Sequence, residues 1–303
     1  MLAVGVVIVA FNSSETIREC LTSCLADPAV AFAVVVDNAN EASCRRIVEA
    51  LAVQDPRVRY VPSDNVGFSR GCNRGADLIS SCDALAFINP DVKVTRSLGE
   101  LATRLDRSRY AIMSGRLMVP EHPTAVNARP RVSMRRELVA SLVGGGRAYA
   151  LKSASAIPTH GQEIEVGQVA GAMLLISRLD FEQLRGFDEQ FELYYEDVDL
   201  AARALDLGGS VLINEEWGIH DAGKSAVTVS SMAYCVFTIS RARFLRKRYG
   251  RHTLTSLGVL AIACTELVSR SLTRQREGQA ARNQAFFLQL RELKRAGSVR
   301  ILK

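Results

Sequence analysis

Carboxylates crowd one short segment of this chain. The stretch FDEQFELYYEDVDLAARALDLGG places six acidic residues within twelve positions: Asp188, Glu189, Glu192, Glu196, Asp197 and Asp199. Helix capping and a solvated face account for Asp188 and Asp199. They do not explain why Tyr194 and Tyr195 directly precede the last three acids, since aromatic side chains usually bring burial. A carboxylate beside buried surface has a raised pKa, which suits a general base.

A second candidate group combines a carboxylate with an imidazole. Asp91 follows Asn89-Pro90, and proline forces the residue before it into an extended conformation, so the carboxylate is presented at the end of a strand. His220, in WGIHDAGKSA, follows another strand. Together with phosphate oxygens, these two side chains suit a divalent ion. A simple turn and a structural histidine explain the same residues, and the sequence alone does not bring them together.

The third candidate is the glycine-containing stretch NVGFSRGCNRG, which begins at Asn65. Gly67, Gly71 and Gly75 are four apart and therefore share one face of a helix. Close helix packing is one interpretation. The other is a loop and helix N-terminus that approach a nucleotide, with Arg70 near its phosphates. The stretch matches neither the dinucleotide G-x-G-x-x-G pattern nor a P-loop.

The elements that position these residues repeat a strand, a polar loop and a helix. The expected strands are Val4–Ala10, Ala33–Val36, Val58–Val61 and Ala84–Ile88, with helices starting near Glu15 and covering Arg45–Ala52 and Ser69–Ile79. Strands that are apolar without alternation are buried on both faces, as in a parallel sheet covered by helices. Ligands bind such a sheet at the carboxyl ends of its strands, where Asn12, Asp37, Asn65 and Asp91 fall.

The second part of the chain is less regular. Prolines and glycines break the pattern from Val119 to Gln168, which we expect to be rich in loops. The pattern then predicts a strand over Val169–Ile176, a short helix over Leu179–Leu184, a helix over Glu196–Leu207 and a strand over Val211–Ile213.

Composition bounds the class of protein. With 303 residues, 48% of them hydrophobic and 23% charged, the chain is globular and long enough for one large α/β domain with an appendage. Its longest uncharged run near the C-terminus, His252 to Thr265, is shorter than the ~20 residues of a spanning helix. The seven cysteines form no C-x-x-C pair, which disfavours a zinc ribbon, and neither a basic leader nor a cleavage site precedes the first strand, so we expect a cytoplasmic protein.

Charge divides the chain into two parts. Residues 1 to 230 hold 23 Lys and Arg against 29 Asp and Glu, whereas residues 231 to 303 hold 15 against 3, a net +12. In this tail, Tyr234 to Tyr249 mixes bulky apolar residues with five basic ones, and Phe286, Phe287, Leu290 and Leu293 line one face of a later helix. Such stripes suit a helix lying on an anionic membrane. They are also explained by packing on the rest of the chain or on a second subunit, as in a homodimer.

Seven ordered segments resemble the inverting family 2 glycosyltransferases of the GT-A fold, particularly the bacterial rhamnosyltransferase-like branch that builds surface polysaccharide or lipopolysaccharide. They are VVIVAFNS, VVVDNAN, NVGFSRGCNRGA, FINPDV, GAMLLISR, GFDEQFELYYEDVDLAARALDLG and the later His220, and they span residues 4 to about 225. The resemblance implies a Rossmann-like mixed sheet flanked by helices. It places a catalytic domain over 1–228, with a nucleotide-binding half over 1–118 and an acceptor-binding half over 119–228, and a basic amphipathic helical tail over 229–303.

The resemblance also implies a role for each matching residue. Asp37 would bind the nucleobase, within a nucleotide pocket formed by Ala10, Asn12, Asn65, Gly67, Arg70 and Asn89. FINPDV stands where the family has its D-x-D motif and keeps only the last acid, so Asp91 would coordinate Mg²⁺ or Mn²⁺, with His220 completing the metal site. Asp197 would be the catalytic base, and Glu196 would orient the acceptor.

The implied reaction transfers a sugar with inversion. The donor favoured by the resemblance is dTDP-L-rhamnose, with UDP-galactofuranose and other UDP- or GDP-sugars as alternatives. The acceptor would be a saccharide or lipid-linked saccharide, reached by peripheral docking on the inner face of the cytoplasmic membrane.

Three rival interpretations are weaker. A sugar-1-phosphate nucleotidyltransferase needs a Gly-rich N-terminal loop with a lysine, which VAFNSSET lacks. A nucleic-acid-binding protein fits the basic tail but not the acidic body or the aliphatic residues among the arginines, so we expect no nucleic-acid partner. A lectin-like relative without activity differs only in turnover.

Overall fold

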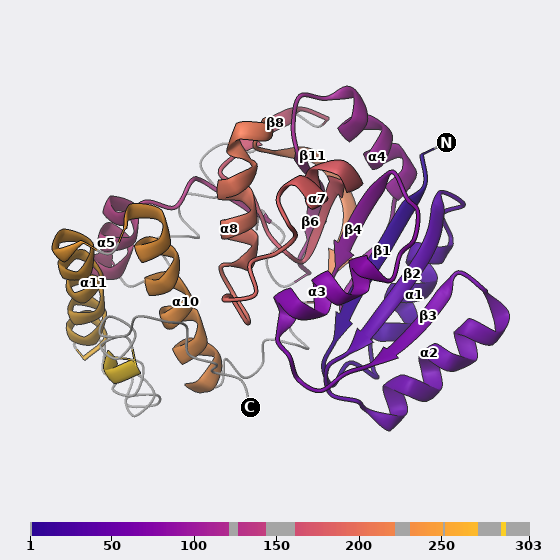
Figure 1. The fold of residues 1–303 in the computed structure, drawn as a ribbon, viewed down its shortest axis with the longest axis horizontal. Helices are drawn as coiled ribbons and strands as arrows, with labels where there is room; N and C mark the ends of the chain where they lie inside the picture. Colours follow the sequence, from indigo (N-terminus) through magenta and orange to yellow (C-terminus); the bar gives the residue numbers. More distant parts are fainter. Residues whose placement is uncertain are drawn as a thin grey trace.

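A computed structural model describes residues 2–120, 127–143, 161–221, 231–250, 252–271 and 286–288. Its centre is a nine-stranded sheet in the order β3-β2-β1-β4-β10-β6-β11-β5, with β8 paired to β11 (Figure 1). The first four strands in this order are parallel: β3 (Val58–Pro62), β2 (Val30–Asp37), β1 (Val4–Ala10) and β4 (Ala84–Ile88). The chain is therefore an α/β protein with a mixed, largely parallel sheet, as expected.

Antiparallel strands extend the sheet beyond β4. β10 (Met173–Ser177) runs against both β4 and β6 (Ile112–Met118), and β11 (Ser210–His220) runs parallel to β6. β11 also pairs antiparallel with β5 (Val92–Val94) and β8 (Glu163–Val166). A separate two-stranded sheet joins β7 (Ala128–Arg129) to β9 (Gln168–Val169).

Helices cover both faces of the sheet, and its central strands β1 and β4 are buried on both sides. One apolar cluster includes residues of α1 (Ile17–Leu25), α2 (Ala42–Gln54) and α4 (Leu98–Arg107). The other includes residues of α3 (Phe68–Asp77), α7 (Arg178–Gln183) and α8 (Glu196–Arg203), which the 3₁₀ turn η1 (Ala204–Leu207) continues.

Three sequence-based expectations differ from the structure in detail. The first helix begins at Ile17 rather than near Glu15, and its N-cap Thr16 makes no side-chain cap. The strand expected over Val169–Ile176 is interrupted at Ala170–Ala172, between β9 and β10. The loop-rich middle contains α5 (Met134–Val143), while residues 121–126 and 144–160 of that middle lie outside the described part.

The beginning of the tail is part of the folded body. α10 (Ser231–Tyr249) and α11 (Thr253–Ser271) pack with each other and with α5 in a helical layer at the left of Figure 1. A third apolar cluster joins Phe244 and Leu245 of α10 and Ile262 of α11 to Phe191 and Tyr195. Of the two explanations for the stripe along Tyr234 to Tyr249, packing on the protein holds and a membrane-facing stripe does not, because its apolar side chains are buried in this packing. The later stripe lies largely outside the described residues, which there include only 286–288.

Candidate active site

Asp91 and His220 meet at one edge of the sheet. Asp91 directly precedes β5, and β11 pairs with β5 so that His220 lies opposite Val92. His220 Nε2 is 3.3 Å from Asp91 Oδ1, and the two side chains are 19% and 2% exposed. The backbone reinforces this pairing, because the amide of Asp221 donates to the carbonyl oxygen of Asp91 at 3.0 Å. The structure thus brings together the two residues considered as metal ligands.

The donor set of this pair fits a shared metal site. No group of three or more His, Cys, Asp or Glu side chains that could hold a metal ion occurs in the described part of the chain. Asp91 and His220 supply one carboxylate and one imidazole. Mg²⁺ and Mn²⁺ accept such ligands and are commonly held by few protein groups together with substrate phosphates. The residues present therefore fit a divalent ion that a diphosphate helps to hold.

Asp37 lies at the end of β2 and shapes the loop that follows. It is fully buried, and its carboxylate accepts hydrogen bonds from the amides of Ala39 at 3.1 Å and Glu41 at 2.9 Å and from the hydroxyl of Tyr60 at 2.8 Å. A carboxylate has about four acceptor positions. A nucleobase bound here would therefore donate a further hydrogen bond to a carboxylate that already accepts these three from the protein.

The other predicted nucleotide residues lie at the same edge of the sheet. Ala10 ends β1 beside Asp37, and the exposed Asn12 follows with a positive φ of 51°. Asn89 follows β4, next to β1, and its amide donates to the carbonyl oxygen of Ala172 at 2.9 Å. The structure therefore places Ala10, Asn12, Asp37 and Asn89 at the carboxyl ends of adjacent strands.

Gly67 connects this edge to the acidic segment. Its carbonyl oxygen accepts a hydrogen bond from the side chain of Asn38 at 3.0 Å, and its amide approaches Asn65 Oδ1 at 3.4 Å. Gly67 has a φ of 89°, and a Cβ there would lie 2.7 Å from the carbonyl oxygen of Glu192. Only glycine combines this conformation with this close approach. Arg70 lies in the first turn of α3. Its side chain is half exposed, and its Nε atom lies 3.4 Å from Oε2 of Glu189.

Glu196 and Asp197 begin α8, directly after two tyrosines in a left-handed conformation. Tyr194 and Tyr195 have φ values of 63° and 68°. Bulky residues rarely adopt this conformation, and backbone strain of this kind is concentrated at functional sites. Tyr195 is buried against Phe237 and Phe244 of α10, which accounts for the aromatic pair noted in the sequence.

The two carboxylates have different surroundings. Asp197 is partly exposed and accepts hydrogen bonds from the amides of Gly171 at 3.1 Å and Val198 at 2.8 Å. Glu196 is 6% exposed, and its Oε2 atom has no hydrogen-bond partner among the residues that the structure describes. Burial raises the pKa of both carboxyls, most strongly that of Glu196, which the charge of Asp197 raises further, whereas Arg129 acts to lower the pKa of Asp197.

One short path of contacts joins the metal-ligand candidates to these carboxylates. Asn89, two residues before Asp91, donates its amide to Ala172, and the neighbouring Gly171 donates its amide to Asp197. The interruption between β9 and β10 allows the amide of Gly171 to point toward the carboxylate of Asp197. The expected ligand, nucleotide and base residues thus form one continuous region.

Comparison with known families identifies the class of protein. The sequence profile of glycosyl transferase family 2 matches residues 5–161, which is more than half of the chain. The chain belongs to this family. It is a glycosyltransferase, and its matched part contains the expected nucleotide residues and Asp91 but ends before Glu196 and Asp197.

A curated relative and solved structures agree with this assignment. The low-salt glycan biosynthesis hexosyltransferase Agl10 of Haloferax volcanii is 25% identical over 273 residues, covering 84% of this chain and 81% of the relative. S. aureus TarS shares the fold with a TM-score of 0.57 at 11% identity, covering 97% of this chain and 81% of that chain. The mannosyltransferase PcManGT of Pyrobaculum calidifontis, solved with GDP-Man and Mn²⁺, has a TM-score of 0.57 at 13% identity, covering 96% and 85%.

A further neighbour matches only in part. GalNAc-T7, solved with UDP, GalNAc and Mn²⁺, has a TM-score of 0.57 at 14% identity, and the match covers 73% of this chain and 43% of that chain. At these identities the solved structures establish the GT-A fold alone.

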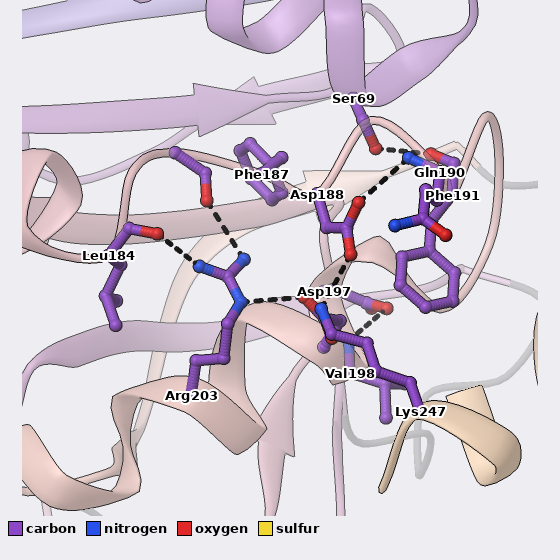
Figure 2. A network of polar contacts seen from close by, with 12 residues as sticks. Ser69, Leu184, Phe187, Asp188, Gln190, Phe191, Asp197, Val198, Arg203 and Lys247 are labelled. Atoms are coloured by element: carbon purple, nitrogen blue, oxygen red, sulfur yellow. Dashed lines mark hydrogen bonds and ion pairs between the residues drawn. The ribbon is translucent and has the colours of Figure 1, made fainter. Parts of the chain in front are cut away.

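Several residues that contact or influence this region had no signal in the sequence. Asn73 holds both backbone polar groups of Phe187, accepting from the amide at 2.9 Å and donating to the carbonyl at 3.0 Å. Arg129 comes from the irregular middle, and Lys247 comes from the tail. Lys247 Nζ lies 2.6 Å from both Asp188 and Asp199, within the network of Figure 2. These contacts join distant parts of the chain, so only an alignment of relatives offers a signal for them.

Proposed function

We propose that this family 2 enzyme transfers a hexose or deoxyhexose from a nucleotide-diphospho-sugar to a saccharide hydroxyl with inversion, and that Asp197 is the base. The observation that carries this proposal is the path from Asp91 through Asn89, Ala172 and Gly171 to Asp197. Donor-side and acceptor-side groups are thereby held in one frame. Such fixed geometry supplies much of the rate advantage of a bound pair of reactants.

On the donor side, Asp37, Asn12 and Asn65 bind the nucleoside, and Gly67 lets the backbone approach the nucleotide. Ala10, Arg70 and Asn89 complete the pocket at the edge of the sheet. Asp91 and His220 would hold Mg²⁺ or Mn²⁺, and the ion would offset the negative charge that develops on the leaving diphosphate. Two solved neighbours contain Mn²⁺, which supports a divalent metal here.

On the acceptor side, Asp197 removes the proton of the attacking hydroxyl. The hydroxyl oxygen then forms the new bond to the anomeric carbon on the face opposite the leaving diphosphate, so the configuration inverts in one step. The amides of Gly171 and Val198 keep the carboxylate of Asp197 oriented. Glu196, whose pKa is raised by burial, orients the acceptor. The raised pKa of Asp197 suits a base that must take a proton near neutral pH.

Different donor sugars are favoured by the sequence resemblance and by the relatives of known structure or activity. The rhamnosyltransferase-like segments favour dTDP-L-rhamnose. Agl10 is named a hexosyltransferase, and the solved neighbours include complexes with UDP and with GDP-Man. UDP- and GDP-hexoses therefore stand beside dTDP-rhamnose as donor candidates.

A thermal-shift screen tests this proposal and distinguishes the donors. UDP, dTDP, GDP and CDP are each added with Mn²⁺, Mg²⁺ or EDTA. A ligand at 100 times its Kd adds about 2.7 kcal/mol of stability. We expect a shift with one nucleotide that EDTA abolishes. Equal melting temperatures under all conditions, confirmed by calorimetry, would contradict the proposed donor site.

The acceptor is proposed to be a saccharide or lipid-linked saccharide in bacterial surface polysaccharide or lipopolysaccharide synthesis, at the inner face of the cytoplasmic membrane. No helix of the described residues has the length and hydropathy to cross a membrane. Two observations support docking on an anionic surface instead: residues 231–303 carry a net +12, and Leu254 and Leu257 of α11 are 81% and 55% exposed. A homodimer through the same leucines is the alternative.

A further inference from the structure

The acceptor-side loop, defined here as Asp188–Tyr195, leads directly into the helix that carries Asp197. α3 holds this loop from the donor side. The hydroxyl of Ser69 donates to the carbonyl oxygen of Phe191, and the amide of Phe68 donates to that of Glu192. These bonds tie the loop to the part of the enzyme that follows Gly67.

α10 holds the same loop from the opposite side. The hydroxyl of Ser240 donates to the carbonyl oxygen of Leu193 at 2.9 Å, and the guanidinium of Arg243 donates to that of Gln190. Lys247 completes this set one turn further along α10. The loop is therefore fixed by backbone contacts with two helices that are far apart in the sequence.

Lys247 is the group that reaches beyond the loop to the catalytic helix. Its ammonium lies 2.6 Å from Asp188 Oδ2, at the start of the loop, and 2.6 Å from Asp199 Oδ1, in the first turn of α8. Figure 2 shows Lys247 reaching from α10 toward Asp188 and toward the start of α8, where Asp197 lies. The ammonium of Lys247 thus connects Asp188 to Asp199, and Asp197 lies between these two residues in the sequence.

Asp199 is a buried carboxylate whose negative charge is balanced by Lys247 and Arg203. The side chain of Asp199 is 3% exposed, and its other oxygen accepts from Arg203 Nε at 2.7 Å. Arg203 itself donates to the carbonyl oxygens of Leu184 and Gly186. A buried carboxylate between two cations has a defined position, whereas one that loses a cation is held less firmly.

We propose that Lys247 is a positioning residue for catalysis, which fixes the first turn of α8 and thereby the carboxylate of Asp197. It lies outside the part of the chain that the family 2 profile matches. This inference rests on the proposed role of Asp197 as base. Its consequence is that the basic tail, through α10, completes the active site of the full chain.

Hydrogen exchange of the full chain tests the positioning without a donor or acceptor. Lys247→Met removes the charge and keeps much of the side-chain length. Arg248→Met is the matched control, because Arg248 is the next residue on α10 and is exposed. We expect amide exchange in residues 188–199 to rise about tenfold in Lys247→Met and to stay unchanged in Arg248→Met, while α1 and β1 keep their protection. Unchanged exchange in Lys247→Met would overturn the proposal.

Kinetics separate positioning from a merely structural contact. Nucleotide release from UDP-glucose, GDP-mannose and dTDP-rhamnose is followed per folded molecule, well below the melting temperature. We expect the kcat of Lys247→Met to fall about 10- to 100-fold with the donor KM changed less than about threefold, because a displacement of about 1 Å has this cost. Lys247→Arg should recover most of the loss. A wild-type kcat in Lys247→Met would reject positioning even if exchange rises.

Asp197→Asn, measured in parallel, keeps this inference distinct from the proposed function. If Asp197→Asn is inactive and Lys247→Met is fully active, only the inference about Lys247 fails. If Asp197→Asn retains wild-type turnover, the proposed base is wrong and the role of Lys247 as a support for it fails with it.

Discussion

His220 Nε2 lies 3.3 Å from Asp91 Oδ1, although most of the catalytic domain separates the two residues in the sequence. The antiparallel pairing of β11 with β5 produces this contact, since it sets His220 opposite Val92. A loop contact would be easily displaced, whereas this one is set by the register of a sheet. The sheet therefore holds Asp91 and His220 in a fixed relative position before any ligand binds.

We expect Asp91→Ala and His220→Ala to lose the metal-dependent part of nucleotide binding, because each removes one of the two proposed protein ligands. The measurement is the thermal shift by the nucleotide that binds wild type, with Mn²⁺ and with EDTA. Asp77→Ala is the control, since Asp77 is exposed on α3. If wild type and both variants respond to the nucleotide equally in Mn²⁺ and EDTA, the metal assignment fails.

Asp197→Asn should lower turnover by roughly 10²–10⁴, the range typical of general-base catalysis, while the nucleotide-induced thermal shift stays intact. The amide keeps the shape of the carboxylate but cannot accept the proton. Asp206→Asn, an exposed site in η1, is the matched control. Turnover near that of wild type would show that another group is the base.

The sheet was largely predictable, and its exceptions have physical causes. β1 and β4 are continuous apolar runs because both of their faces are buried. β11 is much longer than the predicted Val211–Ile213. The prediction ended too early because charged residues interrupt the apolar pattern of the strand. One of them, Glu215, is buried and paired with Arg96 and Arg104. A strand with buried ion pairs does not have the sequence pattern of a strand.

The candidate site was predictable where it depended on local motifs. Asn12, Asp37 and Asn89 lie at strand ends, as the doubly wound pattern indicates. The path through Gly171 was not predictable, because the apolar run VAGAMLLI gives no sign of a break. The use of α10 was misjudged for a similar reason: an apolar stripe with arginines does not reveal whether protein or lipid covers it.

Arg129→Gln should shift the acid limb of the pH–rate profile upward. Arg129 acts to lower the pKa of Asp197, so its removal leaves burial less opposed and the carboxyl keeps its proton to higher pH. Because the base must be ionised, activity should fall more at pH 6 than at pH 9. The pH dependence of kcat/KM measures this, with the exposed Arg131→Gln as control. An unchanged acid limb would show that Arg129 does not influence the base.

Glu196→Gln should stabilise the protein at high pH and not at low pH. The unfolded chain ionises this carboxyl near its ordinary pKa of about 4.3. Burial raises the pKa of Glu196 in the folded chain, which therefore binds more protons than the unfolded chain above that value. Its contribution to stability is complete below the ordinary pKa and is lost as pH rises through the folded pKa.

Glutamine stays neutral, so the melting temperature of Glu196→Gln should exceed that of wild type at pH 8 and equal it at pH 4. Scanning calorimetry at both pH values is the measurement, and the exposed Glu49→Gln is the control. A pH-independent difference would indicate altered packing rather than a buried titrating carboxyl.

Leu254→Ser/Leu257→Ser should weaken membrane binding without unfolding the enzyme. Truncation after Ser230 is unsuitable as a test, because it removes α10 and the apolar side chains that pack against Phe191 and Tyr195. The two leucines are exposed, so their replacement spares that cluster. Burial of a leucine contributes about 1.5–3 kcal/mol, so the double variant should bind vesicles containing phosphatidylglycerol at least about tenfold more weakly.

Val53→Ser is the control for this measurement, because Val53 is 89% exposed on α2, which belongs to a different cluster. Phosphatidylcholine vesicles test the charge contribution, since the basic tail should favour anionic lipid over neutral lipid. Equal cosedimentation of wild type and the double variant would exclude the α11 leucines as a membrane contact. A loss of dimer on size exclusion, with lipid binding unchanged, would instead assign these leucines to a contact between two copies of the chain.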